Sequence, residues 1–85
     1  MLDEIEKEIL ECLTFEESLA HIYEEIGRPK PVVLDVLKTL LTKDLVQAFA
    51  IDLKSGRPMP TPFYDSDKMD EFLFRITKKG IDRLY

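Results

Sequence analysis

The chain has 85 residues, of which 45% are hydrophobic and 34% are charged, and its formal net charge is −5 at pH 7. This length suits one small domain, which we expect to span residues 1–85. No apolar run is long enough to cross a bilayer, and one cysteine with one histidine provides neither an internal disulfide nor an ordinary structural zinc site.

The first two predicted elements are amphipathic helices. Asp3 followed by Glu6 has the spacing of a capping box, and apolar residues then recur at every third or fourth position. Thr14 with Glu17 repeats that spacing, so we expect the second helix to begin there and to end at Gly27. The N-terminus is acidic and amphipathic, unlike a secretory or transit segment, and this favours a cytoplasmic protein.

A third helix is predicted after Gly27, ending near Lys43. Pro31 suits its first turn, where the missing N–H would have no partner within the helix. The apolar spacing predicts an inward face made of Val33, Val36, Leu37 and Leu40. It leaves a more exposed set consisting of Lys30, Val32, Leu34, Asp35, Lys38 and Leu41.

The rest of the chain has the pattern of strands followed by a short helix. Residues 46–53 and 71–76 are rich in β-branched and aromatic side chains. Between them, prolines at positions 58, 60 and 62 favour an extended segment, which an edge strand tolerates and a central strand does not. We expect a hairpin with an enlarged, partly irregular arm, and then a helix capped by Thr77 that runs to Tyr85.

The order helix, helix, helix, strand, strand, helix predicts an α+β, mostly helical fold of the winged-helix type. Within residues 26–46 the chain resembles the helix-turn-helix of MarR- and ArsR-type bacterial transcriptional regulators. Those families have a Lys-Gly-Leu-Val run before the wing, and Lys43-Asp44-Leu45-Val46 stands in that place, with Asp44 where glycine is usual. Residues 76–84 are similar to the Leu-Thr-x-x-Gly-x-x-x-Leu run that follows the wing. The resemblance implies a dimeric DNA-binding protein that regulates transcription.

The charge distribution bears on this function. Residues 1–26 carry a net charge of −8, whereas residues 27–85 carry +3. A recognition helix lies in the major groove, with flanking cations on phosphates. The expected DNA contacts are Arg28, Lys30, Val32, Leu34, Asp35 and Lys38 in the helix-turn-helix, and Lys54 and Arg57 at the tip of the wing. Base reading usually uses amide, hydroxyl or guanidinium groups, so an apolar and acidic helix face is unusual.

An alternative hypothesis is a protein-protein interaction module that keeps the fold and does not bind DNA. Its docking residues would be Leu34, Leu41, Phe63 and Tyr64, although the two leucines could equally pack beneath the first helix or the long arm. A homodimer would use the first helix, the last helix (Ile81, Leu84, Tyr85) or the arm.

No pattern of catalytic residues is found in the sequence. Asp65, Asp67 and Asp70 lack the glycine and the spaced glutamate of a calcium loop. Cys12 and His21 fall on different helices, with no third group to orient them. We expect no enzymatic activity, no metal or other cofactor and no contact with a membrane.

Overall fold

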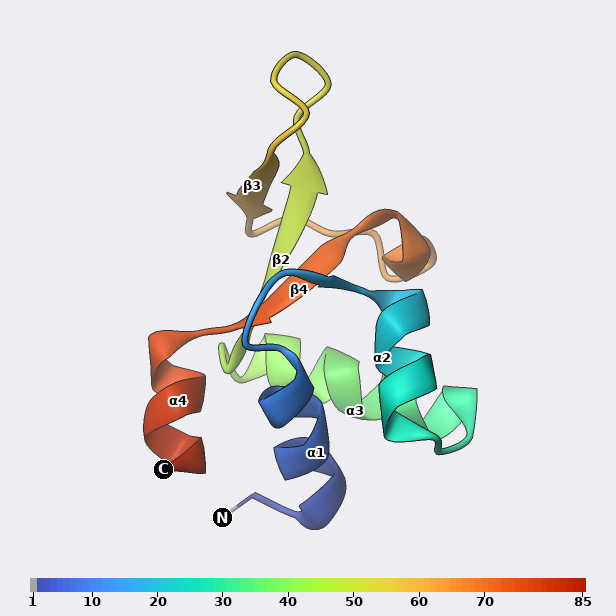
Figure 1. Ribbon diagram of the computed structural model, residues 1–85, viewed down its shortest axis with the longest axis vertical. Helices are drawn as coiled ribbons and strands as arrows, with labels where there is room; N and C mark the ends of the chain where they lie inside the picture. The colour runs from blue at the N-terminus through green and yellow to red at the C-terminus, as the bar shows by residue number, and fades with distance from the viewer. Residues whose placement is uncertain (1) are drawn as a thin grey trace.

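The computed structural model describes residues 2–85 and combines four α-helices with one four-stranded antiparallel sheet (Figure 1). The helices are α1 (Glu4–Cys12), α2 (Leu19–Ile26), α3 (Lys30–Thr42) and α4 (Lys78–Leu84). The strands are β1 (Glu17–Ser18), β2 (Val46–Ile51), β3 (Pro58–Thr61) and β4 (Leu73–Ile76), with a short 3-10 helix, η1 (Met69–Glu71), before β4. The predicted α+β class is confirmed.

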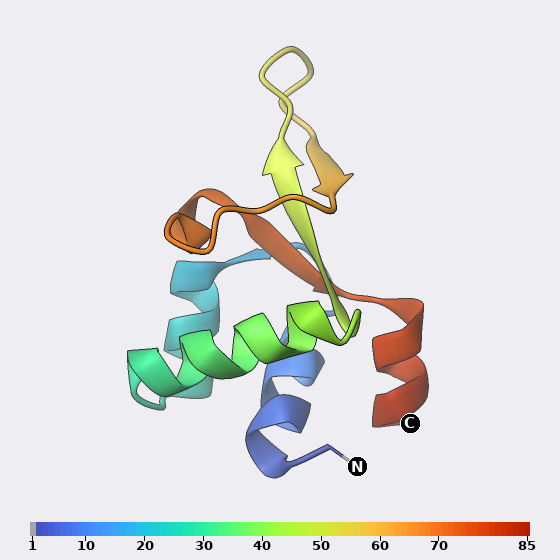
Figure 2. The ribbon, with the colours of Figure 1, turned by 180° about the vertical axis from the view of Figure 1, so that it is seen from behind.

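The sheet has the strand order β1-β4-β2-β3, so the last strand lies between the first and the second. In the register of β2 with β4, Ala48 pairs with Phe74 and Val46 pairs with Ile76, and all four side chains are buried in the core. The intervening residues, among them Arg75, lie on the opposite face. Helices α1, α2 and α3 gather at one end of the sheet, and the β2–β3 hairpin projects from the other end (Figures 1 and 2).

Local capping explains where the first two helices begin. Asp3 and Glu6 form the predicted capping box, and the second carboxylate oxygen of Glu6 accepts from Lys43 Nζ at 3.2 Å. The prediction that Thr14 caps the second helix is wrong, because its hydroxyl donates to the Glu11 carbonyl at the end of α1. Ser18 caps α2 instead, and the residues between the two helices form β1.

Residues 43–46 and 76–84, the two segments that resemble the regulators, meet where α3, β2 and α4 come together. Asp44 follows α3 with φ +61°, the left-handed conformation that glycine adopts most easily. Thr77 caps α4 by accepting from the Gly80 N–H, and its hydroxyl donates to the Asp44 carbonyl at 2.7 Å. The Thr77 N–H donates to the Leu45 carbonyl at 3.0 Å. The motifs therefore attach α4 to the start of β2.

Strand β3 lies at the edge of the sheet, which is the position that tolerates its prolines. Pro58 and Pro60 pair with Ile51 and Phe49 at alternate positions, which leaves their nitrogens on the outer side of the strand. The predicted pairing of residues 46–53 with residues 71–76 is also present as β2 with β4. The sequence pattern did not predict that β3 would add a further strand beside β2.

Candidate nucleic-acid interface

Helices α2 and α3 follow each other through a tight connection. Gly27 ends α2 with φ +65°, and its N–H donates to the Tyr23 carbonyl. Pro29 precedes the first residue of α3, and Pro31 occupies its first turn, where the N–H that proline lacks is not needed. Three residues therefore redirect the chain, and α3 runs along one side of the molecule (Figure 2).

The outward face of α3 differs from the predicted one. Val33, Leu37 and Leu40 are buried as expected, but Leu41 is buried too, and Leu34 is half-buried against the core. Leu41 lies beside the arm between β3 and η1, where Pro62 and Tyr64 line the same small cavity. The placement of Leu34 and Leu41 on an open docking face is therefore wrong. Leu41 instead packs in the core, beside the arm.

Two threonines take part in the face that α3 exposes, and the sequence interpretation did not select them. Thr39 and Thr42 are exposed, and their hydroxyls donate to the carbonyls of Asp35 and Lys38. Their spacing could have identified them, because Thr39 lies four residues after Asp35 and Thr42 lies three residues after Thr39. Residues three and four apart share a helix face. The exposed surface of α3 thus combines Val32 and Asp35 near its beginning with hydroxyl groups near its end.

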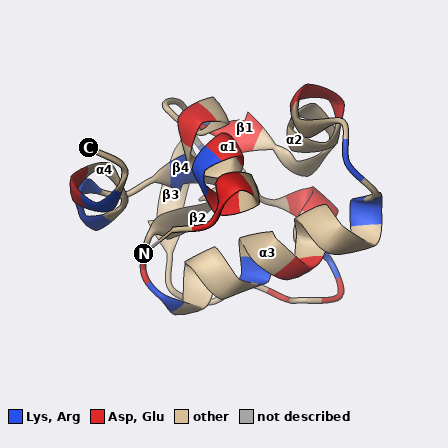
Figure 3. Cartoon of the chain, turned by 90° about the horizontal axis from the view of Figure 1, so that it is seen from below, with Lys and Arg blue, Asp and Glu red and all other residues tan. Residues whose placement is uncertain are grey.

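The cations predicted for DNA differ in their surroundings. Arg28 Nε donates to Glu8 Oε2 of α1 at 2.8 Å, and this bond raises the pKa of Arg28. The positive charge of its guanidinium is therefore already paired with a carboxylate. Lys30 Nζ lies 5.4 Å from the centre of the Tyr23 ring, and Lys38 is half-buried on α3. Along α3 both signs of charge occur, while α1 is mainly acidic (Figure 3).

The β2–β3 hairpin ends in a compact turn that carries the other two predicted cations. The Asp52 N–H donates to the Arg57 carbonyl at 2.9 Å, and the Asp52 carbonyl accepts from Gly56, whose φ is +71°. The Asp52 carboxylate accepts from the Ser55 hydroxyl and from the Lys54 N–H, which lowers its pKa. The acid is thus held within the turn, while Lys54 and Arg57 are exposed.

An acidic arm lies between α3 and the tip of the hairpin. The chain from β3 to η1 crosses β2 on the side where α3 lies (Figure 2). It carries Asp65, Asp67, Asp70 and Glu71, all exposed. Helix η1, which carries Asp70, contacts α2. Burial, and then the charge of Asp70, raises the pKa of Tyr23 on that helix. Carboxylates of the arm therefore lie between the cations of α3 and those of the hairpin tip.

His21 lies beside two carboxylates. Its Nε2 is 3.4 Å from Glu17 of β1 and 4.0 Å from Glu25 of α2. Within residues 2–85 there is no cluster of three or more histidine, cysteine, aspartate or glutamate side chains able to hold a metal ion. Over the same residues no helix has the length and apolar character that crossing a membrane requires.

Comparison of the chain with protein-family models, with curated proteins and with solved structures finds no match.

Proposed function

We propose that the chain is a winged-helix protein that binds duplex DNA and regulates transcription, with α3 in the major groove and the β2–β3 hairpin on the phosphate backbone. The observation that carries the proposal is the hairpin tip. It projects away from the helices, keeps Asp52 engaged inside its turn and leaves Lys54 and Arg57 free to contact phosphates. The helix-turn-helix of α2 and α3, followed by the sheet, agrees with this arrangement.

The proposed interface offers few positive charges to the DNA. Arg28 is paired with Glu8, so four of the predicted cations, Lys30, Lys38, Lys54 and Arg57, serve as phosphate partners. Each neutralised phosphate contributes about −0.9 to the slope of log affinity against log salt, and four contacts give about −3.6. The acids of the arm reduce non-specific attraction further. We therefore expect binding that is strong only at low salt or at a preferred sequence, which Thr39 and Thr42 would help to read.

The test begins with selection of bound fragments from a genomic DNA pool by the purified protein at low salt. The selected duplex is then titrated by fluorescence anisotropy over a salt series with wild type and with Lys54→Glu/Arg57→Glu. The double variant should bind at least about tenfold more weakly, with a slope shallower by about 2. Lys7→Glu, which changes an exposed lysine of α1, is the control and should bind like wild type. Recovery of no duplex, or equal binding by the hairpin variant, would refute the proposal.

A protein-binding module is the second candidate, and the arm favours it. Phe63 is 84% exposed next to the acidic residues of the arm, which is suited to a partner with a basic and apolar segment. Of the four docking residues predicted from the sequence, only Phe63 is open, because Leu34, Leu41 and Tyr64 pack on the core. Loss of partner capture by Phe63→Ser, with DNA binding absent in wild type, would select this function over the first.

A further inference from the structure

The tip of the β2–β3 hairpin carries a leucine that the rest of the fold leaves uncovered. Leu53 is 98% exposed, the highest value among the large hydrophobic residues that the structure leaves exposed. Tight turns are usually built from glycine, proline, asparagine, aspartate and serine, each of which suits the turn backbone. A leucine offers the turn no such advantage, so the reason for its presence has to be sought outside the turn.

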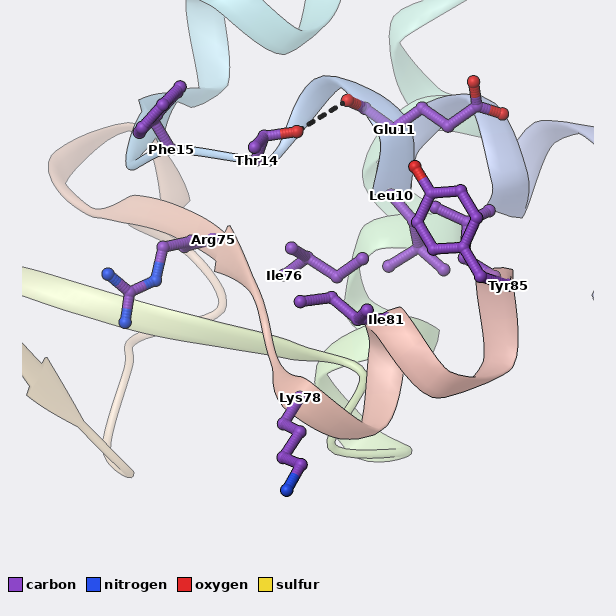
Figure 4. A pocket seen from close by; sticks show the side chains of 10 residues that line it. Leu10, Glu11, Thr14, Phe15, Arg75, Ile76, Lys78, Ile81 and Tyr85 are labelled. Carbon is purple, nitrogen blue, oxygen red and sulfur yellow. Dashed lines mark hydrogen bonds between the residues drawn. The ribbon is translucent and has the colours of Figure 1, made fainter.

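The surroundings of Leu53 differ from those of the other highly exposed hydrophobic side chains. Phe15 and Tyr85 flank a groove between the end of α1 and α4, which Leu10 and Ile76 also line (Figure 4). The loop between β2 and β3 instead lies at the far end of the molecule from the helices (Figures 1 and 2). Leu53 is therefore presented alone, at the end of a projection.

The stem of the hairpin holds this leucine away from the sheet. Strand β2 pairs with β4 only as far as Phe49, and beyond that residue it pairs with β3 alone. A strand advances about 3.3 Å per residue, so the turn that begins at Asp52 lies about 10 Å beyond the pair of Phe49 with Leu73. The minor groove of B-DNA is about 7.5 Å deep. The tip can therefore reach the floor of a minor groove before the sheet itself meets the DNA.

The turn also fixes the position from which Leu53 projects. The Asp52 N–H donates to the Arg57 carbonyl at 2.9 Å, and the Gly56 N–H donates to the Asp52 carbonyl at 2.7 Å. The Asp52 carboxylate accepts from the Ser55 hydroxyl at 2.9 Å. Because these bonds already order the turn, little conformational entropy is lost when the tip binds a partner.

Two cations flank the leucine. Lys54 follows it directly and Arg57 closes the turn, and within residues 2–85 neither side chain forms an ion pair. Proteins that bend DNA from the minor groove use cationic side chains together with an apolar side chain inserted between two base pairs. A lipid surface also attracts cations, but even a myristoyl chain, which is much longer than a leucine side chain, holds a protein there only marginally. The tip therefore suits DNA better than a membrane.

We propose that Leu53 enters the minor groove between two base pairs and kinks the duplex, while Lys54 and Arg57 bind the adjacent phosphates. The inference rests on the proposed DNA-binding function and adds a deformation of the DNA to it. Apolar side chains inserted in this way kink duplexes by about 20–90°. Separating two stacked base pairs is easiest at flexible pyrimidine–purine steps, TA and CA/TG. The protein should therefore prefer a duplex with such a step beneath the hairpin, although leucine forms no hydrogen bond to a base.

The first test measures the bend of the duplex recovered by genomic selection, through energy transfer between dyes at its two ends. Wild type should bring the ends closer. Leu53→Ala should leave the duplex nearly straight and bind it about tenfold more weakly, because the buried apolar surface is lost. Its salt slope should be unchanged, because it alters no charge. Met59→Ala removes a half-exposed apolar side chain from the stem of the same hairpin, and it should bend the duplex as wild type does.

The outcomes separate this inference from the proposed function. A wild-type complex whose duplex stays straight, or equal bending by Leu53→Ala, overturns the insertion of Leu53 and leaves DNA binding intact. Recovery of no duplex overturns both. If wild type sediments with vesicles of phosphatidylcholine and phosphatidylglycerol, Leu53→Ala does not, and the duplex stays straight, the tip binds a membrane and the proposal is wrong.

The second test locates the separated base pairs. 2-Aminopurine, whose fluorescence rises when it is unstacked, is placed at each pyrimidine–purine step of the duplex in turn. One step should respond to wild type and to Leu53→Met, which keeps a large apolar side chain, and not to Leu53→Asn. Changing that step to the stiffer AA should weaken wild type about fivefold and Leu53→Ala by less than about twofold. An equal loss in both proteins, or a response to Leu53→Asn, would refute the insertion.

Discussion

Replacement of Gly80 by alanine tests the contact between α4 and the start of β2. Gly80 is buried in α4, and a Cβ built there would clash with the Leu45 carbonyl oxygen and lie 2.7 Å from Ile76 Cγ1. The Leu45 oxygen also accepts a hydrogen bond from the Thr77 N–H, so its position is fixed by its own backbone and by that of Thr77. The added methyl group therefore has to displace α4 as a whole, because a backbone oxygen cannot rotate away as a side chain can.

Two opposing effects set the size of the change in the free energy of unfolding. Alanine is favoured over glycine inside a helix by about 1 kcal/mol. An additional group forced into a packed site costs about 1–3 kcal/mol, and the fixed oxygen at Leu45 puts this case at the upper end. We expect Gly80→Ala to lower the free energy of unfolding by about 2 kcal/mol. For a domain of this size that corresponds to a fall in Tm of about 8–16 °C.

The measurement is equilibrium urea unfolding followed by circular dichroism, together with thermal melts. Asp82→Ala is the matched control, because it introduces the same residue at an exposed position of the same helix and should be neutral or slightly stabilising. A Gly80→Ala variant as stable as wild type, or more stable, would show that α4 does not approach the Leu45 carbonyl closely, and the account of this joint would be wrong.

Three further predictions follow from local features. Asp44 adopts φ +61°, so Asp44→Gly should raise the free energy of unfolding by about 0.5 kcal/mol and Asp44→Ala should lower it. Urea titration measures both changes, and a glycine variant less stable than wild type would contradict this prediction. Burial, and then Glu25 and Glu17, raises the pKa of Cys12 from 9.0 to about 11. Near pH 8 its alkylation by iodoacetamide should therefore be roughly 100-fold slower in the folded chain than in urea, because the thiolate is that much rarer. Equal alkylation rates in the folded and unfolded chain would disprove the burial. Since the pKa of the thiol is higher in the folded chain, its contribution to stability is complete below pH 9.0 and declines as the pH rises towards about 11. Leu41→Ala should lower the free energy of unfolding by about 2–4 kcal/mol because Leu41 is buried, whereas Phe63→Ala should change it by less than about 0.5 kcal/mol; equal effects in thermal melts would place Leu41 on the surface after all.

Features encoded by near neighbours in the chain could be predicted from the sequence. The capping box of Asp3 and Glu6, the stop at Gly27 and the cap at Thr77 all depend on residues within three or four positions, and each is present. Strand β1 could not be predicted in this way. It has two residues, Glu17 and Ser18, and it exists because they pair with Phe74 and Leu73, more than fifty positions later. No local period records such a pairing.

The same distinction applies to the candidate site. Helical spacing correctly places Val33, Leu37 and Leu40 in the core, but it cannot show that Leu41 is buried as well, beside the arm. The sequence selects Arg28 as a phosphate ligand because it is a cation in a turn. The structure pairs it with Glu8, twenty positions earlier, because α1 packs against α2 and α3. Contacts between distant segments decided both outcomes.

The prolines of β3 also affect how the chain behaves when it is unfolded and refolded. The outer edge of β3 offers carbonyl groups without N–H donors at Pro58 and Pro60, and the opposite edge of the sheet, β1, has only two residues. A partly folded chain therefore offers its neighbours no continuous row of donors and acceptors on which a foreign strand could align. Cross-strand aggregation is disfavoured during refolding, and we expect unfolding to be reversible at the concentrations needed to measure it.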